Sequence, residues 1–299
     1  MARPNAVWRL RTRTLELGAR TLVMGVVNIT PDSFSDGGVF LVLEKAIGHA
    51  LRLIDEGADV LDLGAESTRP GSHAGGADAA VGAEEEQARL LPVLKAILKA
   101  RPDAVVAVDT YKAATARAAL DAGAEIINDV SGLKWDPSLA EVCAEFGAGV
   151  VLMHTRGRPE EWRAQPRLEP DALIAMVREG LAASLHAARS AGIAEEGIVL
   201  DPGYGFGKKF DENYALLARQ GELLTLGRPL VAGLSRKLFL GHTLAGLYGG
   251  EPAPVDKRET ASVAALTAAI LNGASIVRVH EVRAAVEAAR IADAVMKAG

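Results

Sequence analysis

Polar side chains that could take part in chemistry stand directly after short apolar runs, and they recur along the whole chain. Asn28 ends LVMGVVN, Asp109 ends VVAVD, and Asn128, Asp201 and Arg278 occupy equivalent places in later runs. One such residue is ordinary, because Asp and Asn favour turns. A series of them suggests buried strands whose carboxyl ends line one pocket. The alternative for Asp109, Asn128 and Asp201 is that they cap the helices that follow.

These side chains fall into two chemical groups. The first group suits a planar polar heterocycle, because carboxylates accept hydrogen bonds and an amide both donates and accepts. Its members are Asp109, Asn128, Asp201 and Lys237. The second group suits an anion, because the fork of an arginine matches phosphate oxygens. Its members are Asn28, Arg69, Arg278 and His280. The sequence therefore predicts a ligand with a polar ring at one end and a phosphate-like group at the other.

The elements that must position these residues repeat as an apolar run, a turn and a segment with helical spacing. We expect strands at residues 21–27, 59–64, 104–108, 125–127, 149–153, 197–200, 229–233 and 275–279. We expect helices at residues 41–56, 83–99, 112–122, 137–146, 170–191, 213–226, 257–272 and 282–297. Eight strand–helix units predict the α/β class and a closed (β/α)8 TIM barrel. An open doubly wound sheet is the alternative, but no glycine-rich phosphate fingerprint follows the first strand.

The first 20 residues are expected to form a short β-hairpin. Strand-like alternation covers residues 7–14, residues 15–17 follow, and Gly18 suits a turn. Three arginines, at positions 9, 11 and 13, are predicted to lie on an exposed strand face. We expect this hairpin to belong to the same domain as the barrel at residues 21–299.

Composition narrows the class of protein. The chain has 299 residues, 49% of them hydrophobic, which is enough for a large core. A net charge of −5 and 4% aromatic residues argue against nucleic-acid binding. The single cysteine, Cys143, excludes an intrachain disulfide and is expected to fill the core. No apolar run reaches the roughly 20 residues of a membrane helix, so we expect a cytoplasmic protein with no membrane partner.

Eight stretches of the sequence resemble the dihydropteroate synthase family, in one order and over nearly the whole chain. They are NITPDSFSDGG (28–38), DLGAESTRPGS (62–72), VDTYK (108–112), INDVSG (127–132), VLMH (151–154), LDPGYGFGK (200–208), GLSRK (233–237) and RVH (278–280). The resemblance implies that p-aminobenzoate displaces diphosphate from 6-hydroxymethyl-7,8-dihydropterin diphosphate and gives 7,8-dihydropteroate. It also implies Mg²⁺ as cofactor, a homodimer, and a folate-pathway enzyme of the kind that sulfonamides target.

The same resemblance implies roles for individual residues. The pterin side would comprise Asp109, Asn128, Met153, Asp201, Phe206, Gly233 and Lys237. The p-aminobenzoate side would comprise Phe34, Thr68, Pro70, Phe206 and Ser235. The diphosphate would contact Asn28, Thr68, Arg69, Arg278 and His280, with Asn28 also at the metal. The candidate catalytic residues are Asp109, Lys237, Arg278 and His280, and His154 is expected to play a supporting part.

The chemistry of such a reaction agrees with the residues present. A cation delocalised into the ring needs a nearby anion such as Asp109, and the leaving diphosphate needs positive groups. An arylamine is already a nucleophile at neutral pH, which fits the absence of an evident Ser–His or Cys–His pair. Two departures from the family pattern are Ala65, in place of a glycine, and Leu238, where many members have Ser. The alternatives are a pterin-binding methyltransferase and a catalytically silent pterin-binding paralogue.

Overall fold

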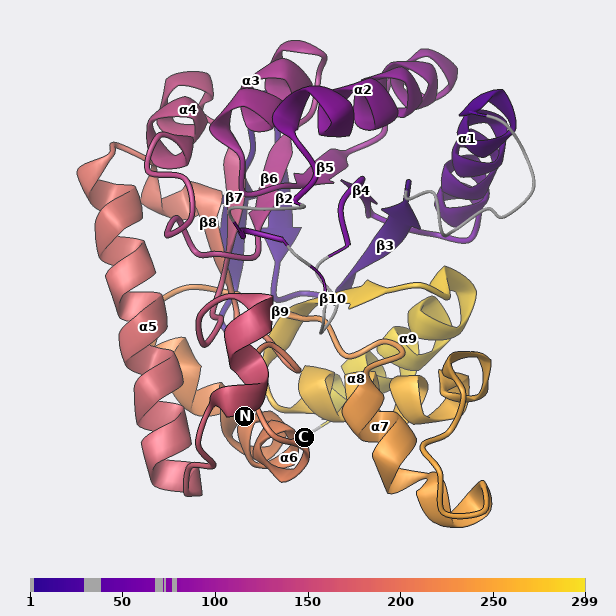
Figure 1. The fold of residues 1–299 in the computed structure, drawn as a ribbon, viewed down its shortest axis with the longest axis vertical. Coiled ribbons are helices and arrows are strands. Elements are labelled where there is room, and N and C mark those ends of the chain that lie inside the picture. The colour runs from indigo at the N-terminus through magenta and orange to yellow at the C-terminus, as the bar shows by residue number, and fades with distance from the viewer. Residues whose placement is uncertain (1–2, 30–38, 68–71, 73, 77–79, 299) are drawn as a thin grey trace.

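The computed structural model describes residues 3–29, 39–67, 72, 74–76 and 80–298, and these form a closed barrel of parallel strands (Figure 1). Around the barrel the strand order is β10-β3-β4-β5-β6-β7-β8-β9. The strands are β3 (Leu22–Asn28), β4 (Val60–Gly64), β5 (Val106–Asp109), β6 (Ile126–Asp129), β7 (Gly149–Met153), β8 (Ile198–Asp201), β9 (Leu230–Ala232) and β10 (Ala274–Val279). The predicted (β/α)8 fold is therefore confirmed, and the open sheet is excluded.

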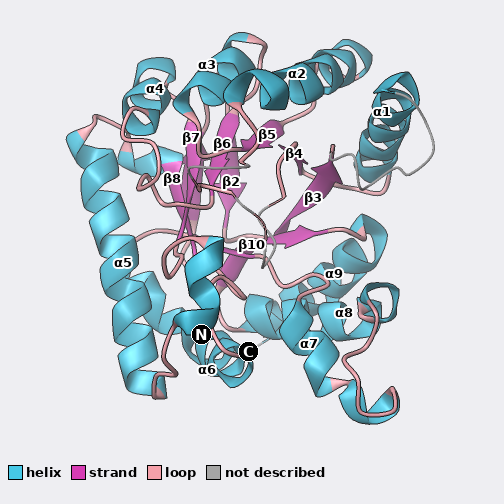
Figure 2. Ribbon diagram, viewed as in Figure 1, coloured by secondary structure: helices cyan, strands magenta, loops and turns pink. Residues whose placement is uncertain are grey.

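Helices surround the barrel (Figure 2). They are α1 (Val39–Asp55), α2 (Ala83–Ala100), α3 (Ala113–Asp121), α4 (Leu139–Phe146), α5 (Pro170–Ser190), α6 (Phe210–Arg219), α7 (Leu238–Thr243), α8 (Glu259–Leu271) and α9 (Val282–Ala298). Helix α4 ends at its C-cap Gly147, which adopts a left-handed φ of 60° that glycine tolerates without a steric cost. None of the helices in the described part of the chain is long and apolar enough to cross a membrane.

The helices differ from the prediction at two main places. The segment predicted at 213–226 starts earlier, as α6, and continues as a 3-10 helix at Gln220–Leu226. Helix α7 was not predicted, because its six residues are too few to show a helical period. It matters for the site, because Lys237 immediately precedes it.

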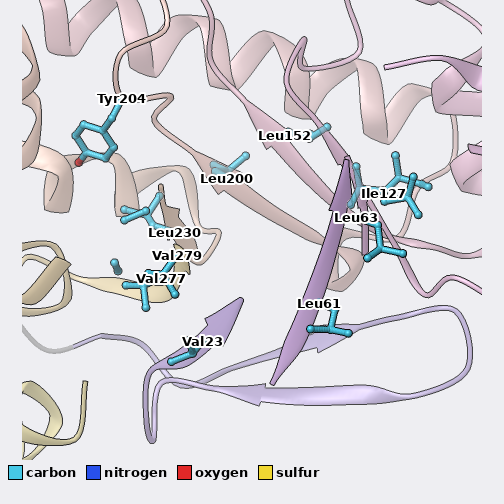
Figure 3. Close-up of a cluster of buried hydrophobic side chains, with 14 of the residues drawn as sticks. Val23, Leu61, Leu63, Ile127, Leu152, Leu200, Tyr204, Leu230, Val277 and Val279 are labelled. Carbon is cyan, nitrogen blue, oxygen red and sulfur yellow. The ribbon is translucent and has the colours of Figure 1, made fainter. Parts of the chain in front are cut away.

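Side chains of each strand alternate between two cores. Outward residues such as Leu61 and Leu63 pack in a cluster that includes helix residues (Figure 3). Inward residues such as Val60 form a second cluster inside the barrel. Because side chains on a strand alternate with a period of two, the next inward position after Val60 is Asp62. The same step leads from Ala107 to Asp109, Ile126 to Asn128, Val151 to Met153, Val199 to Asp201, Val231 to Gly233 and Ile276 to Arg278.

The N-terminal hairpin lies against the amino ends of the barrel strands. It consists of β1 (Ala6–Arg9) and β2 (Thr14–Leu17), paired antiparallel. Trp8 is fully buried among the inward residues, and its indole Nε1 donates to the carbonyl of Gly197 at 2.9 Å. Arg3 makes an ion pair with Asp293 of α9 at 2.7 Å. The hairpin thus fills the end of the barrel opposite the strand-end polar residues.

The hairpin lies within the first 20 residues, as predicted, but its turn differs from the prediction. The turn falls at residues 10–13 rather than at Gly18, so Arg11 and Arg13 lie in the connection. Arg11 Nε donates to the carbonyl of Ala124 at 3.1 Å, and Arg13 Nη1 donates to the carbonyl of Asp103 at 2.8 Å. Alternation alone could not show this, because an arginine that bonds to the barrel and one that faces water have the same spacing.

We expect Trp8→Ala to destabilise the whole protein by about 3–5 kcal/mol, because it removes a large buried side chain and leaves a cavity. Urea unfolding followed by far-UV circular dichroism would measure the change. The matched control is Val7→Ala on the same strand, where Val7 is 47% exposed. If Trp8→Ala left the main unfolding transition unchanged, residues 1–20 and 21–299 would not form a single domain.

Candidate active site

The inward polar residues lie at one end of the barrel, where the parallel strands terminate. In the strand register, Asn28 pairs with Gly64, Gly64 with Asp109, and Asp109 with Asn128. These neighbours follow one another around the rim, so the strand ends that the sequence singled out do meet at one mouth. The two predicted chemical groups are therefore on the same rim and not on opposite rims.

Arg278 is held between two carboxylates at the centre of this mouth. Its Nε donates to Asp62 Oδ2 at 2.6 Å, and its Nη2 donates to Asp109 Oδ2 at 2.8 Å. Asn128 Nδ2 donates to the same Asp62 Oδ2 at 3.0 Å. Arg278, predicted to bind the anion, therefore touches Asp109 directly and reaches Asn128 through Asp62. The sequence reasoning gave Asp62 no role, although its inward position two residues after Val60 was visible.

The charges in this cluster shift one another's proton affinity. Burial raises the pKa of Asp109 to about 7; Arg278 opposes the increase and Asp62 adds to it. Burial by itself would lower the pKa of Arg278, but the carboxylates of Asp62 and Asp109 raise it. Arg278 is therefore a permanent cation, whereas Asp109 can hold or release a proton near neutral pH.

Asp201 lies on the far side of Arg278 from β4. Its Oδ1 accepts the backbone N–H of Gly203 at 2.7 Å, which fixes the carboxylate and the turn after β8. A Cβ atom on Gly233 would lie 3.7 Å from Asp201 Oδ2 and 4.0 Å from Arg278 Cβ. Burial raises the pKa of Asp201, against the Gly203 N–H and the charge of Lys237. A side chain at position 233 would therefore occupy the space between Asp201 and Arg278, and glycine leaves that space unfilled.

Lys237 approaches Phe206, so two more predicted residues come together. Its Nζ lies 4.2 Å from the centroid of the Phe206 ring, a distance that allows a cation–π contact. The preceding residue, Arg236, has a left-handed φ of 60°, which is unfavourable for a non-glycine residue. Ser262 Oγ accepts the N–H of Arg236 at 2.9 Å, and Arg258 Nη1 donates to its carbonyl at 3.1 Å. These bonds hold the strained turn that presents Lys237.

His280 and Ser235 form a pair on the anion side of the mouth. His280 Nδ1 lies 3.0 Å from Ser235 Oγ, and its backbone N–H donates to the same oxygen at 3.3 Å. Ser235 was assigned to the p-aminobenzoate side, and its partner in the structure is a residue assigned to the diphosphate. Met153 pairs in register with Asp201 and packs in a small cluster that Phe206 also contacts.

A buried lysine that sequence reasoning missed connects the loops after β7 and β8. Lys208 Nζ lies 3.0 Å from His154 Nδ1 and donates to the carbonyl of Gly203 at 2.7 Å. Burial lowers the pKa of Lys208 to about 7, and burial together with Lys208 lowers that of His154 well below its ordinary value. His154 therefore contacts Lys208 in this loop region, and its supporting part stays a prediction. Cys143 is fully buried in the outer core, as predicted.

The capping alternative fails for the strand-end residues. The residues at the N-caps of α3, α4 and α6 are Lys112, Ser138 and Lys209, and none of the three caps involves Asp109, Asn128 or Asp201. The three side chains instead point inward, toward Arg278 and its neighbours.

Four predicted site residues, Phe34, Thr68, Arg69 and Pro70, lie outside the described residues. The described flanks of the second loop are attached to the strand-end region after β5. Lys112 Nζ makes an ion pair with Glu66 at 2.6 Å, and the N–H of Gly75 donates to the hydroxyl of Tyr111 at 2.9 Å. These contacts involve only the ends of the loop, so the roles of Phe34, Thr68, Arg69 and Pro70 stay predictions.

The residues present fit a magnesium ion that arrives with a diphosphate. Among the described residues, no group of three or more His, Cys, Asp and Glu side chains could hold a metal. Mg²⁺ commonly keeps several waters and binds through few protein oxygens together with substrate phosphates. Asn28, partly buried at the rim, offers one such oxygen.

Comparisons with known proteins agree with this geometry. Residues 24–280 match the family described as "Pterin binding enzyme". The dihydropteroate synthase of Mycobacterium leprae is 44% identical over 279 residues, covering 93% of this chain and 94% of that protein. The dihydropteroate synthase of Synechocystis is 40% identical over 280 residues, covering 94% of this chain and 92% of that protein.

Solved structures give the same result. A dihydropteroate synthase of Xanthomonas albilineans with 4-aminobenzoic acid is 40% identical, covers 98% of both chains and has a TM-score of 0.84. The same protein with 7,8-dihydropteroate gives a TM-score of 0.81 at 38% identity, covering 97% of this chain and 98% of that one. A Yersinia pestis dihydropteroate synthase with a sulfonamide drug gives a TM-score of 0.86 at 39% identity, covering 98% of this chain and 100% of that one. This chain belongs to the dihydropteroate synthase family of pterin-binding enzymes.

Proposed function

We propose that this protein condenses 6-hydroxymethyl-7,8-dihydropterin diphosphate with p-aminobenzoate, releasing diphosphate and 7,8-dihydropteroate. The single observation that supports this most strongly is the position of Arg278, which contacts Asp62 and Asp109 and lies beside Asp201. One cation thus lies between a set of groups suited to a polar ring and a set suited to an anion. The relatives are named dihydropteroate synthase, and solved structures of relatives contain 4-aminobenzoic acid or 7,8-dihydropteroate.

The reaction assigns a task to each side of the mouth. Asp201, Asn128 and Lys237 orient the dihydropterin, and Arg278 and His280 bind the diphosphate. The bond between the pterin methylene and the diphosphate oxygen breaks, and both electrons of that bond leave with the diphosphate. The carboxylate of Asp109 stabilises the positive charge left on the ring and methylene. The amine of p-aminobenzoate then forms the new C–N bond and loses a proton to solvent.

A divalent cation completes the anion side. We propose that Asn28 holds Mg²⁺ through its side-chain oxygen, with the diphosphate supplying further oxygens. When bound, the ion neutralises negative charge that develops on the leaving diphosphate.

The alternatives differ from this proposal in testable ways. A pterin-binding methyltransferase has no need of Arg278 and His280 beside the ring-binding residues. A silent paralogue would bind the pterin without turnover. We also propose that the protein acts in the cytoplasm, which its one buried cysteine suits.

We further propose a homodimer, as the family resemblance implies. Exposed apolar side chains on and near the packed helices α6 and α7 support it: Phe210 is 47% exposed, Leu238 44% and Leu247 79%. A solution mass of two 31.3 kDa chains by light scattering would agree with this arrangement.

The direct test is to mix purified protein with dihydropterin diphosphate, p-aminobenzoate and Mg²⁺, and to measure dihydropteroate and diphosphate. We expect both products in equal amounts, and no dihydropteroate when p-aminobenzoate is omitted. Pterin binding without any product would support the silent paralogue and end the proposed activity.

Asn28→Ala is expected to raise the Mg²⁺ concentration needed for half-maximal rate, because the variant lacks the side-chain oxygen. Titration of Mg²⁺ at saturating substrates measures this change. Ser275→Ala is the control, because Ser275 is buried in β10 away from the rim. Equal Mg²⁺ requirements for wild type and Asn28→Ala would remove Asn28 from the metal site.

The pH profile should report Asp109. Its proton leaves as the pH rises through about 7, so the stabilising carboxylate is present above that pH. We expect kcat/KM for the pterin diphosphate to rise with pH around 7 in the wild type. Asp109→Asn should lose this rise and about 10²–10³-fold in kcat. The substrate's own phosphate ionisation is common to both proteins and therefore cancels in the ratio of their profiles.

Folding stability gives an independent check of the same group. The pKa of Asp109 is raised from 3.8 in the unfolded reference to about 7 in the folded protein. Between these values the folded state binds more protons than the unfolded state, so stability falls as the pH rises. Relative to Asp109→Asn, the wild type should therefore lose stability from about pH 4 to 7. Parallel stability curves for the two proteins would contradict a raised pKa.

A further inference from the structure

Asp62 is buried beneath the mouth and has an unusual set of contacts. It is 0% exposed, and its Oδ2 accepts from both Arg278 Nε and Asn128 Nδ2. Its Oδ1 is also buried and has no hydrogen-bond partner among the described residues. A buried polar atom without a partner costs free energy. The pairing with Arg278 therefore uses one oxygen of Asp62, whereas burial of the second oxygen opposes stability.

The contacts of Asp62 determine which way the Asn128 amide points. A guanidinium can only donate hydrogen bonds, so the Asp62 oxygen that faces Arg278 Nε must be an acceptor. The Asn128 atom that faces the same oxygen must then be the NH2 group and not the carbonyl. The carbonyl oxygen Oδ1 of Asn128 is consequently directed away from Asp62.

An amide that could rotate freely would accept ligands with either a donor or an acceptor at the same position. Rotation by half a turn exchanges an acceptor for a donor at the same place. With its NH2 group held by Asp62, Asn128 offers its carbonyl oxygen to an N–H group of the ring. Asp62, on another strand, therefore determines whether Asn128 presents an acceptor or a donor to the ligand.

We propose that Asp62 is a positioning residue for ring specificity: its Oδ2 fixes the Asn128 amide with the carbonyl oxygen toward the ligand. The inference rests on the proposed function, in which Asn128 binds the pterin ring. Asp62 itself need not touch the ligand. The substrate class that this arrangement selects is a heterocycle with an N–H donor opposite Asn128.

Two substitutions separate the acceptor from the charge at position 62. Asp62→Ala removes the acceptor, so the Asn128 amide becomes free to rotate. Asp62→Asn keeps an oxygen, and Arg278 favours the rotamer that turns this oxygen toward its own Nε–H. The asparagine variant should therefore still hold the NH2 group of Asn128, although it carries no charge.

The test measures the dissociation constant of 6-hydroxymethylpterin, which has no diphosphate, so that the binding of a phosphate by Arg278 does not enter. We expect Asp62→Ala to weaken binding about tenfold to a hundredfold, and Asp62→Asn only a few-fold. In a double-mutant cycle, Asp62→Ala should have little further effect once Asn128→Ala is present. The KM for p-aminobenzoate should stay near the wild-type value in Asp62→Ala.

Several outcomes would overturn the inference. Additive losses for Asp62→Ala and Asn128→Ala would show that Asp62 does not act through the amide. An Asp62→Asn protein as weak as Asp62→Ala would show that charge, and not the acceptor oxygen, matters. If Asp62→Ala does not fold, Asp62→Leu fills the volume without an acceptor and takes its place in the cycle. A wild-type protein that does not bind the pterin at all would instead overturn the proposed function, and the inference with it.

Discussion

The cation of Arg278 between two carboxylates is the interaction on which the mouth of the barrel depends. Asp62 and Asp109 come from neighbouring strands, and their buried negative charges would repel each other without a cation. Arg278 donates to both, at 2.6 Å and 2.8 Å. Taking away one partner of such a buried group typically costs about 3–5 kcal/mol, because the remaining charge is left uncompensated. In the proposed reaction, the same cation binds the diphosphate.

This interaction exists only because the barrel closes. Arg278 lies on β10 and Asp62 on β4, and β3 joins the two strands by pairing with both. The hairpin at the other end supports the closure, because Trp8 and its neighbours fill the interior beneath the polar layer. The charged residues form one layer at the strand ends, between the apolar interior of the barrel and the mouth. The opposite ends of the barrel therefore divide stability and chemistry between them.

Buried cations away from the mouth hold the loops that carry the site. Lys208 bonds to carbonyls of the loops after β7 and β8, and Arg258 with Ser262 holds the strained turn at Arg236. Most of these contacts use backbone groups of the loops, and Lys208 also contacts the side chain of His154. The side chains of Phe206 and Lys237 contact each other at the mouth. Such prior positioning lowers the cost of ordering the site when substrates bind.

The spacing of apolar and polar residues indicates which face of each strand is polar and at which end. A period of two and an apolar run are local properties, so Asp109, Asn128, Asp201 and Arg278 could be placed at the mouth before any contact was known. The turn of the hairpin and helix α7 were missed because short segments carry too few repeats of either period. The partners of these residues follow from the folded barrel: Arg278 pairs with Asp62, 216 residues away in the chain, and Ser235 with His280. Distances between strands arise from closure of the barrel, and no local pattern encodes which side chains then come within hydrogen-bond reach.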